Sequence, residues 1–169
     1  MSLEIEKKFL VDYKDWNENK SLFTLQPYYY IRQGYIPTIT NTVRIRLVDI
    51  VPDGLSFSFV TLKGKSHGLS RSEYEYEIPV NDAKEIMEEM CSTFIEKYRF
   101  LYKDDLGNVW EFDEFLGDNR GLVIAEIEFD NINSVDSIKK PFNFIGEELT
   151  NSKYSNYNLS KNPYNLWKE

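Results

Sequence analysis

The 169-residue sequence is poor in cysteine and histidine, with Cys91 and His67 as the single residue of each type. One cysteine excludes an internal disulfide and a zinc site built from cysteines. No apolar run approaches the roughly 20 residues that a membrane-spanning helix needs. The start of the chain also lacks the basic and apolar regions of a secretory signal. We therefore expect a soluble protein of the reducing cytoplasm.

Basic residues are also in the minority. The chain has 20 Lys and Arg against 28 Asp and Glu, a net charge of −8 and a pI near 4.8. An acidic chain binds nucleic acid poorly unless its cations are gathered in one place, so we expect no nucleic-acid partner. Apolar residues at 41% suffice for a packed core. The length predicts a single domain over residues 1–169, present as a monomer or homodimer.

An alternation of apolar and polar residues runs through most of the chain, which is typical of strands with one buried face. In the first run, Leu3, Ile5 and Phe9 share one face and Glu4 and Glu6 the other. Eight strands are predicted in this way: Leu3–Val11, Pro27–Tyr35, Asn41–Asp49, Ser56–Lys63, Arg71–Pro79, Phe94–Lys103, Asn108–Phe115 and Gly121–Asp130.

Helices interrupt this pattern at a few places, and the tail beyond Ser152 has no clean period. The fold class is therefore mainly β with added helices (α+β). The predicted helices are Asp82–Thr93 with Asn81 as N-cap, Val135–Leu149 opened by Ser134 and broken at Pro141, and a weaker one over Val11–Leu22.

The polar faces of these strands carry doublets of like charge. Arg44 and Arg46 share a face, as do Lys97 and Arg99, whereas other strands carry paired glutamates. On a single strand this means only a solvated outer face. Its recurrence over several strands points elsewhere, because adjacent like charges repel unless a ligand of opposite sign is bound. We expect an eight-stranded antiparallel barrel, closed into a tunnel with a charged interior and helices packed outside.

The two kinds of doublet suit the two parts of a metal–phosphate complex. One guanidinium group can donate two parallel hydrogen bonds to the oxygens of a phosphate group. Carboxylate oxygens favour Mg²⁺ or Mn²⁺ over zinc. Cations and carboxylates in one cavity are the apparatus of phosphoryl transfer. The segment Gly64-Lys65-Ser66 lacks the upstream glycine of a Walker loop and is a chance match.

With these charged doublets, the sequence resembles the CYTH superfamily, which is also called the triphosphate tunnel metalloenzymes. Within that superfamily it is most similar to the small bacterial triphosphatases. The resemblance runs from Leu3 to about Leu159. It begins with the opening block Glu4-Ile5-Glu6-Lys7-Lys8-Phe9-Leu10-Val11, and eight further blocks follow in the family's order. These are Gln33-Gly34-Tyr35, Val43-Arg44-Ile45-Arg46, Thr61-Leu62-Lys63-Gly64, Arg71 to Pro79, Lys97-Tyr98-Arg99, Trp110-Glu111-Phe112-Asp113, Gly121 to Glu128, and Lys153-Tyr154-Ser155-Asn156.

The resemblance implies a metal-dependent hydrolase, using Mg²⁺ or Mn²⁺, that removes the terminal phosphoryl group of triphosphates. The expected substrates are inorganic tripolyphosphate in the first place and nucleoside triphosphates in the second. The implied metal ligands are Glu4, Glu6, Glu126, Glu128 and Asp113. The implied triphosphate-binding residues are Lys8, Arg44, Arg46, Lys63, Arg71, Lys97, Arg99 and Lys153. Those implied in catalysis are Lys8, Arg44, Arg46, Lys63, Glu73, Glu75, Lys97 and Arg99.

Other functions stay open beside this one. The family also contains class IV adenylate cyclases, although the His-Phe segment that precedes their first glutamates is absent before Glu4. A non-enzymatic polyphosphate-binding protein would use the same cations, but it has no need of the paired glutamates. An acidic β scaffold without a ligand would have a filled barrel or an open sandwich.

Overall fold

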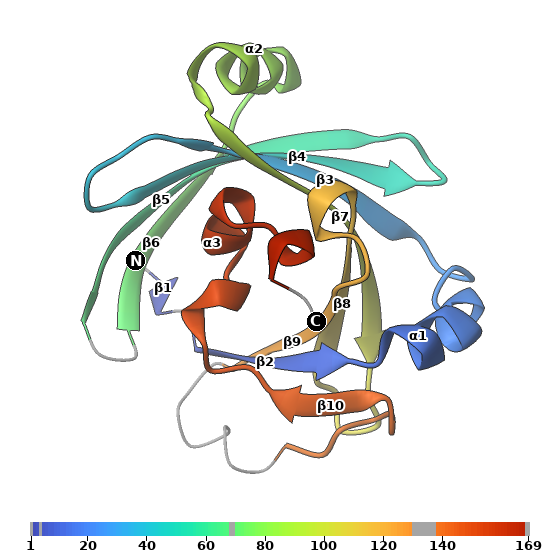
Figure 1. Cartoon of the computed structure of the whole chain (residues 1–169). Coiled ribbons are helices and arrows are strands. Elements are labelled where there is room, and N and C mark those ends of the chain that lie inside the picture. Colours follow the sequence, from blue (N-terminus) through green and yellow to red (C-terminus); the bar gives the residue numbers. More distant parts are fainter. Residues whose placement is uncertain (1, 4, 68–69, 130–137, 168–169) are drawn as a thin grey trace.

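The computed structural model describes residues 2–3, 5–67, 70–129 and 138–167 (Figure 1). Within them, ten strands form one sheet in the order β1-β6-β5-β4-β3-β7-β8-β9-β2-β10, and neighbouring strands run antiparallel. The strands are β1 (Ser2–Leu3), β2 (Glu6–Val11), β3 (Tyr28–Ile36), β4 (Thr42–Val51), β5 (Ser56–His67), β6 (Ser70–Glu77), β7 (Thr93–Lys103), β8 (Val109–Phe115), β9 (Val123–Glu128) and β10 (Ile145–Glu148).

The first predicted strand, Leu3–Val11, is divided between two distant parts of the sheet. β1 pairs with β6, whereas β2 pairs with β9 and β10. The chain between Leu3 and Glu6 therefore connects β1, at one end of the strand order, with β2, the last strand but one at the other end. Figure 1 shows the sheet curving around the C-terminal helices. The prediction of a mainly antiparallel β fold with a few helices is confirmed.

Two helical segments cover the outer face of the sheet. The helix α1 (Tyr13–Asn19) begins at Asp12, whose side chain accepts a hydrogen bond from the amide of Asp15 at 2.9 Å. Its Trp16 is fully buried and stacks on Phe112, with ring centroids 5.3 Å apart. Truncating such a tryptophan costs about 3–5 kcal/mol. A 3₁₀ turn, Lys20–Leu22, follows α1, so the weaker predicted helix over Val11–Leu22 is confirmed in shorter form.

The helix α2 (Val80–Met90) packs on the outer side of β3, β4 and β5 (Figure 1). Its Ala83 is buried in one cluster with Ile45 and Leu47. Its N-cap is Pro79 and not the predicted Asn81, which lies inside the first turn. The amide of Ala83 bonds to the carbonyl of Pro79 at 3.0 Å. The helix ends before the predicted Thr93, because that residue opens β7.

The predicted helix over Val135–Leu149 is wrong in its described part. Its first residues, with the predicted start at Ser134, lie outside the described residues, and those from 138 onward contain the strand β10 instead. Ile145 pairs with Val11 and is buried in the same cluster as Phe144. The strand β10 thus supplies a hydrogen-bonding partner to the edge of β2. A helix through this segment is also disfavoured because Pro141 lacks the backbone N–H that a helix interior needs.

The C-terminal tail forms a short helix that its sequence did not predict. The helix α3 (Asn156–Lys161) begins at Ser155, whose hydroxyl accepts from the amide of Asn158 at 3.2 Å. The 3₁₀ turns Gly117–Asn119, Ser152–Tyr154 and Tyr164–Leu166 complete the fold. Leu159 is fully buried among Tyr35, Ile95 and Phe115. In the described part of the chain, the helices are all too short or too polar to cross a membrane.

Candidate functional site

A cavity of about 810 Å³ lies between the charged face of the sheet and the C-terminal tail. The protein carries a net charge of −8, yet cations outnumber carboxylates on this wall. The charged side chains that line it, among the described residues, are Lys8, Arg44, Arg46, Lys63, Lys65, Arg71 and Arg99, with Glu6, Glu73, Glu75, Glu111, Glu126 and Glu128. The fold therefore gathers predicted site residues from six strands, β2, β4, β5, β6, β7 and β9, at one place.

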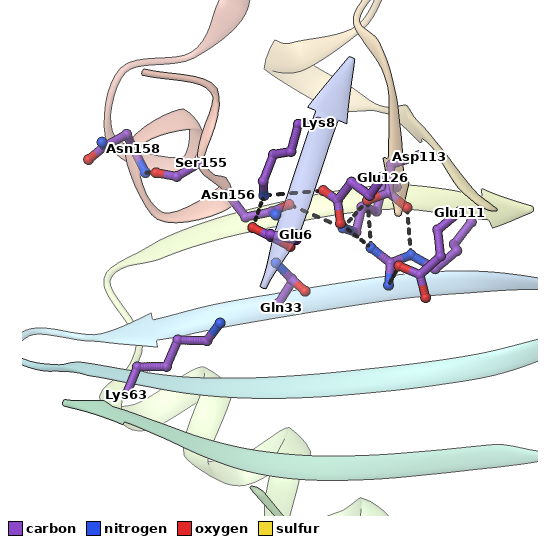
Figure 2. Close-up of polar contacts among 12 residues, drawn as sticks. Glu6, Lys8, Gln33, Lys63, Glu111, Asp113, Glu126, Ser155, Asn156 and Asn158 are labelled. Atoms are coloured by element: carbon purple, nitrogen blue, oxygen red, sulfur yellow. Dashed lines mark hydrogen bonds and ion pairs between the residues drawn. The ribbon is translucent and has the colours of Figure 1, made fainter. Parts of the chain in front are cut away.

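Lys8 on β2 lies between two carboxylates (Figure 2). Its Nζ is 3.0 Å from Glu6 and 3.3 Å from Glu126, which is its cross-strand partner on β9. Burial lowers the pKa of Lys8, but Glu126 and Glu6 outweigh burial and leave the pKa above its ordinary value. Lys8 is therefore a permanent cation within reach of the cavity.

A buried charge network lies behind the wall formed by β7, β8 and β9. Lys97 and Asp113 are fully buried, and Lys97 Nζ is 2.5 Å from Asp113 Oδ2. Arg99 donates to both oxygens of Asp113 and reaches Glu126 at 3.3 Å. Burial raises the pKa of Asp113, but Arg99 and Lys97 outweigh burial and hold that pKa well below its usual range. Burial, assisted by Arg99, lowers the pKa of Lys97 to about 8.

Arg44 and Arg46 lie two residues apart on β4 and share a face. Arg44 Nη2 donates to Thr61 at 3.0 Å and to Glu75 at 3.3 Å. Its buried Nε has no partner among the described residues. Arg46 donates to Gln33 at 3.0 Å, and burial together with Arg44 and Arg99 lowers the pKa of Arg46 to about 10. Two like charges held so close favour an anionic ligand.

The wall continues from β4 into its neighbours β5 and β6. Lys63 Nζ is 3.0 Å from Glu73, and Thr61 donates to Glu75 at 2.8 Å. Arg71 donates to the carbonyl of Gly64 at 2.6 Å and to the hydroxyl of Thr42 at 2.8 Å. These bonds fix the orientation of the side chains at the rim of the cavity.

The structure does not bring every predicted site residue to the cavity wall. Lys97 and Asp113 lie behind it, and both oxygens of Asp113 accept hydrogen bonds from Lys97 or Arg99. The role of Asp113 as a metal ligand stays a prediction. Lys153 is also absent from the wall. Its Nζ lies 4.1 Å from the ring centroid of Trp167. Glu4 lies outside the described residues.

Other residues of the cavity were not among the predicted site residues. Lys65 and Glu111 line it, each two positions from a predicted residue on the same strand. The alternation could have found both. Asn156 also lines it, but from the tail helix α3, for which the sequence carries no periodic signal.

The carboxylates of the cavity wall provide the type of oxygen ligand that a hard divalent cation binds. Glu6 and Glu128 are direct cross-strand partners, and Glu126 lies two positions from Glu128 on the same face. Their oxygens suit Mg²⁺ or Mn²⁺. Within the described residues, no group of three or more acidic, histidine or cysteine side chains is already arranged around a metal position, since Lys8 lies between Glu6 and Glu126.

Comparison with known proteins places the chain in a family. The model of the CYTH domain matches residues 2–152. An inorganic triphosphatase of Acetivibrio thermocellus is 46% identical over 172 residues, covering 100% of both chains. An inorganic triphosphatase of Nitrosomonas europaea is 34% identical over 158 residues, which cover 93% of this chain and 96% of that one. The chain belongs to the CYTH domain family.

Solved structures share the fold. The crystal structure of the inorganic triphosphatase NE1496 has a TM-score of 0.61 and 27% identity, and 95% of each chain is covered. A Hippeastrum protein, whose structure is described as revealing a dominant triphosphatase activity, has a TM-score of 0.57 at 18% identity over 79% of this chain and 82% of that chain. The second likeness shows the fold alone.

Proposed function

We propose that this protein is a divalent-metal-dependent hydrolase that removes the terminal phosphoryl group of triphosphates. The observation that carries the proposal is the single cavity whose wall combines seven cations with six carboxylates among the described residues. The names of the two relatives, both inorganic triphosphatases, support inorganic tripolyphosphate as the first substrate, ahead of nucleoside triphosphates. A pure anion-binding protein would gain nothing from the carboxylates.

The proposal includes a closed tunnel formed by the whole chain, residues 1–169, as one domain. The pairing of β1 with β6 and of β2 with β9 supports closure, because the N-terminal segment then joins the two ends of the strand order. A curved sheet with its charged face inward surrounds the cavity with protein, whose effective dielectric constant is lower than that of water. Electrostatic interactions are stronger there than at the surface.

The cations hold and orient the substrate. Arg44 and Arg46 on β4 offer guanidinium groups to the phosphate oxygens, and Lys63 and Arg71 face the same cavity from β5 and β6. Arg99 and Lys8 lie on the side that carries Glu126. This fixed arrangement places the scissile phosphoryl group in line for attack, and positioning and charge stabilisation supply most of the rate enhancement.

The carboxylates divide into two groups by position. Glu6, Glu126 and Glu128, with Glu4 outside the described residues, would hold Mg²⁺ or Mn²⁺. The ion would neutralise charge on the phosphate oxygens. Glu73 and Glu75 line the cavity from β6, where Glu75 accepts hydrogen bonds from Arg44 and Thr61. These two are the candidates for orienting the attacking water.

Phosphate release from a small substrate panel tests the proposal. Purified protein is incubated with tripolyphosphate, ATP or pyrophosphate in Mg²⁺, in Mn²⁺ and in EDTA. We expect tripolyphosphate to yield equal amounts of phosphate and pyrophosphate, faster than ATP is cleaved, and EDTA to abolish the reaction. Arg44→Ala, purified in the same way, is the control for contaminating phosphatases, because a contaminant would keep its activity when this cavity residue is removed. Arg32→Ala is the control for an unrelated loss of a guanidinium group, because Arg32 pairs with Asp49 away from the cavity.

Two outcomes would overturn the proposal in favour of a named alternative. Tight binding of tripolyphosphate without release in either metal would favour a binding protein. Formation of cyclic AMP from ATP as the main product would favour an adenylate cyclase.

A further inference from the structure

The tail helix α3 reaches into the charged centre of the protein through one side chain. Asn156, the first residue of α3, lines the cavity, and its Oδ1 accepts a hydrogen bond from the buried Lys97 Nζ at 3.2 Å (Figure 2). The buried Leu159 anchors the helix, as does a 2.9 Å bond from Ser160 to Thr93 on β7. The position of the Asn156 amide is therefore fixed by packing that lies outside the cavity.

Lys97 depends on this contact because its ammonium group is shut off from water. The side chain is 0% exposed, and its Nζ donates to Asp113 and Asn156 and lies 5.5 Å from the ring centroid of Phe115. A buried ammonium must find its partners within the protein. Asn156 supplies an uncharged amide oxygen to the ammonium group of Lys97. Asp113 and Phe115 lie on β8, whereas Asn156 comes from the tail helix α3.

The consequence of this contact is carried to the cavity wall by Asp113. Its Oδ2 accepts from both Lys97 at 2.5 Å and Arg99 at 2.7 Å. Arg99 in turn reaches Glu126 and Glu111 on the wall. A displaced Lys97 would therefore draw Asp113 with it and change the orientation of the Arg99 guanidinium.

We propose that Asn156 is a positioning residue, which holds Lys97 against Asp113 and thereby aims Arg99 at the substrate and at Glu126. This inference rests on the proposed function for its kinetic consequence, but the contact itself can be observed without any reaction. The tail helix is then part of the site and not merely a cover over it.

Three variants separate positioning from helix docking. Asn156→Ala removes the acceptor, and Asn156→Asp keeps an oxygen at the same place. Ser160→Ala is the matched control, because it weakens the docking of the same helix without touching Lys97. We expect Asn156→Ala to lower kcat for tripolyphosphate about tenfold, a loss typical of a small misplacement in a site, while KM changes less than kcat. Ser160→Ala should stay within about threefold of the wild type. Asn156→Asp should keep kcat within about threefold, while its added negative charge raises KM for the anionic substrate.

The Lys97 ammonium gives a readout that is independent of activity. In protein labelled with ¹⁵N-lysine, a buried and bonded ammonium exchanges slowly and gives its own signal. We expect this signal to persist in Ser160→Ala and Asn156→Asp and to shift or broaden in Asn156→Ala. If the wild-type protein released no phosphate, the proposed function would fail while this signal still tested the contact.

Two results would overturn the inference. An unchanged ammonium signal and an unchanged kcat in Asn156→Ala would show that the bond positions nothing. An equal loss of kcat in Ser160→Ala and Asn156→Ala would show that docking of the helix, and not the acceptor, matters.

Discussion

Arg99 and Asp113 face each other across β7 and β8 and share two hydrogen bonds, Nε to Oδ1 and Nη2 to Oδ2, both of 2.7 Å. Such a paired geometry is the strongest that a guanidinium and a carboxylate can form. Lys97 adds a second cation to the same carboxylate. One buried anion thus compensates two cations, and Glu126 contributes a second negative charge to Arg99.

Replacing Asp113 by Asn should therefore destabilise the protein severely. The amide cannot compensate the buried Lys97 and Arg99, and breaking a buried ion pair in this way costs about 3–5 kcal/mol. The free energy of unfolding in urea measures the loss. Asp49→Asn is the matched control, since Asp49 pairs with Arg32 on partly exposed ground and should cost about 1 kcal/mol or less. Equal losses in the two variants would contradict the role given to Asp113.

The fold was predictable where its signal is local. The period-2 alternation identified the strands β3 to β9 because a half-buried strand shows this pattern in its own residues. The division of the first strand into β1 and β2, and the pairing of Ile145 with Val11, depend on contacts between distant segments. The helix α3 depends on the burial of Leu159 under Tyr35 and Ile95, which no local propensity reveals.

The sequence indicates which charged residues share a face with the candidate site. It does not indicate which of them reach the cavity and which lie buried behind its wall. Doublets such as Arg44 with Arg46 mark one face of a strand, and that face does line the cavity. The same rule placed Lys97 on the face of Arg99 and, on the next strand, Asp113 on the face of Glu111. Which inward side chains reach the cavity depends on what covers them, and Lys97 is covered by Asn156 of the tail. Depth within a wall is a tertiary property.

Arg44 should act mainly in holding the substrate. Arg44→Ala removes a charged contact to phosphate worth about 1.5–3 kcal/mol, so kcat/KM for tripolyphosphate should fall roughly ten- to a hundredfold, partly through KM. Arg32→Ala removes a guanidinium that pairs with Asp49 and does not line the cavity, and it should leave kcat/KM unchanged. Steady-state kinetics on both variants test this difference, and a matching loss in Arg32→Ala would refute it.

Glu126 should act mainly through the metal. Glu126→Gln keeps the size of the side chain but removes charge next to Lys8 and Arg99, so kcat should fall more than KM rises, because metal charge matters most as charge develops in the transition state. Raising Mg²⁺ should partly restore this variant and leave Arg44→Ala impaired. Titration of activity with Mg²⁺ measures the rescue. Glu148→Gln is the control and should behave like the wild type, because the Glu148 carboxylate lies on β10 and pairs with Lys7 on β2.

Glu111 gives the protein a pH dependence that a single substitution can isolate. Burial raises the pKa of Glu111 from its ordinary 4.5 to about 7, with Arg99 opposing and Asp113 and Glu126 assisting. A carboxyl group with a raised pKa binds its proton more tightly in the folded state. Its contribution to stability is therefore fully present below about pH 4.5 and is lost as the pH rises through 7.

Glu111→Gln cannot ionise and should escape this loss. The free energy of unfolding of Glu111→Gln minus that of the wild type, both metal-free, should increase by about 1–2 kcal/mol between pH 5 and pH 7.5. Urea unfolding at several pH values measures this difference, and it is insensitive to groups that titrate equally in both proteins. Asp53→Asn, in the exposed turn after β4, is the matched control for the loss of a carboxylate. A constant difference for Glu111→Gln would mean that Arg99, 2.5 Å from the Glu111 carboxylate, keeps that group ionised throughout.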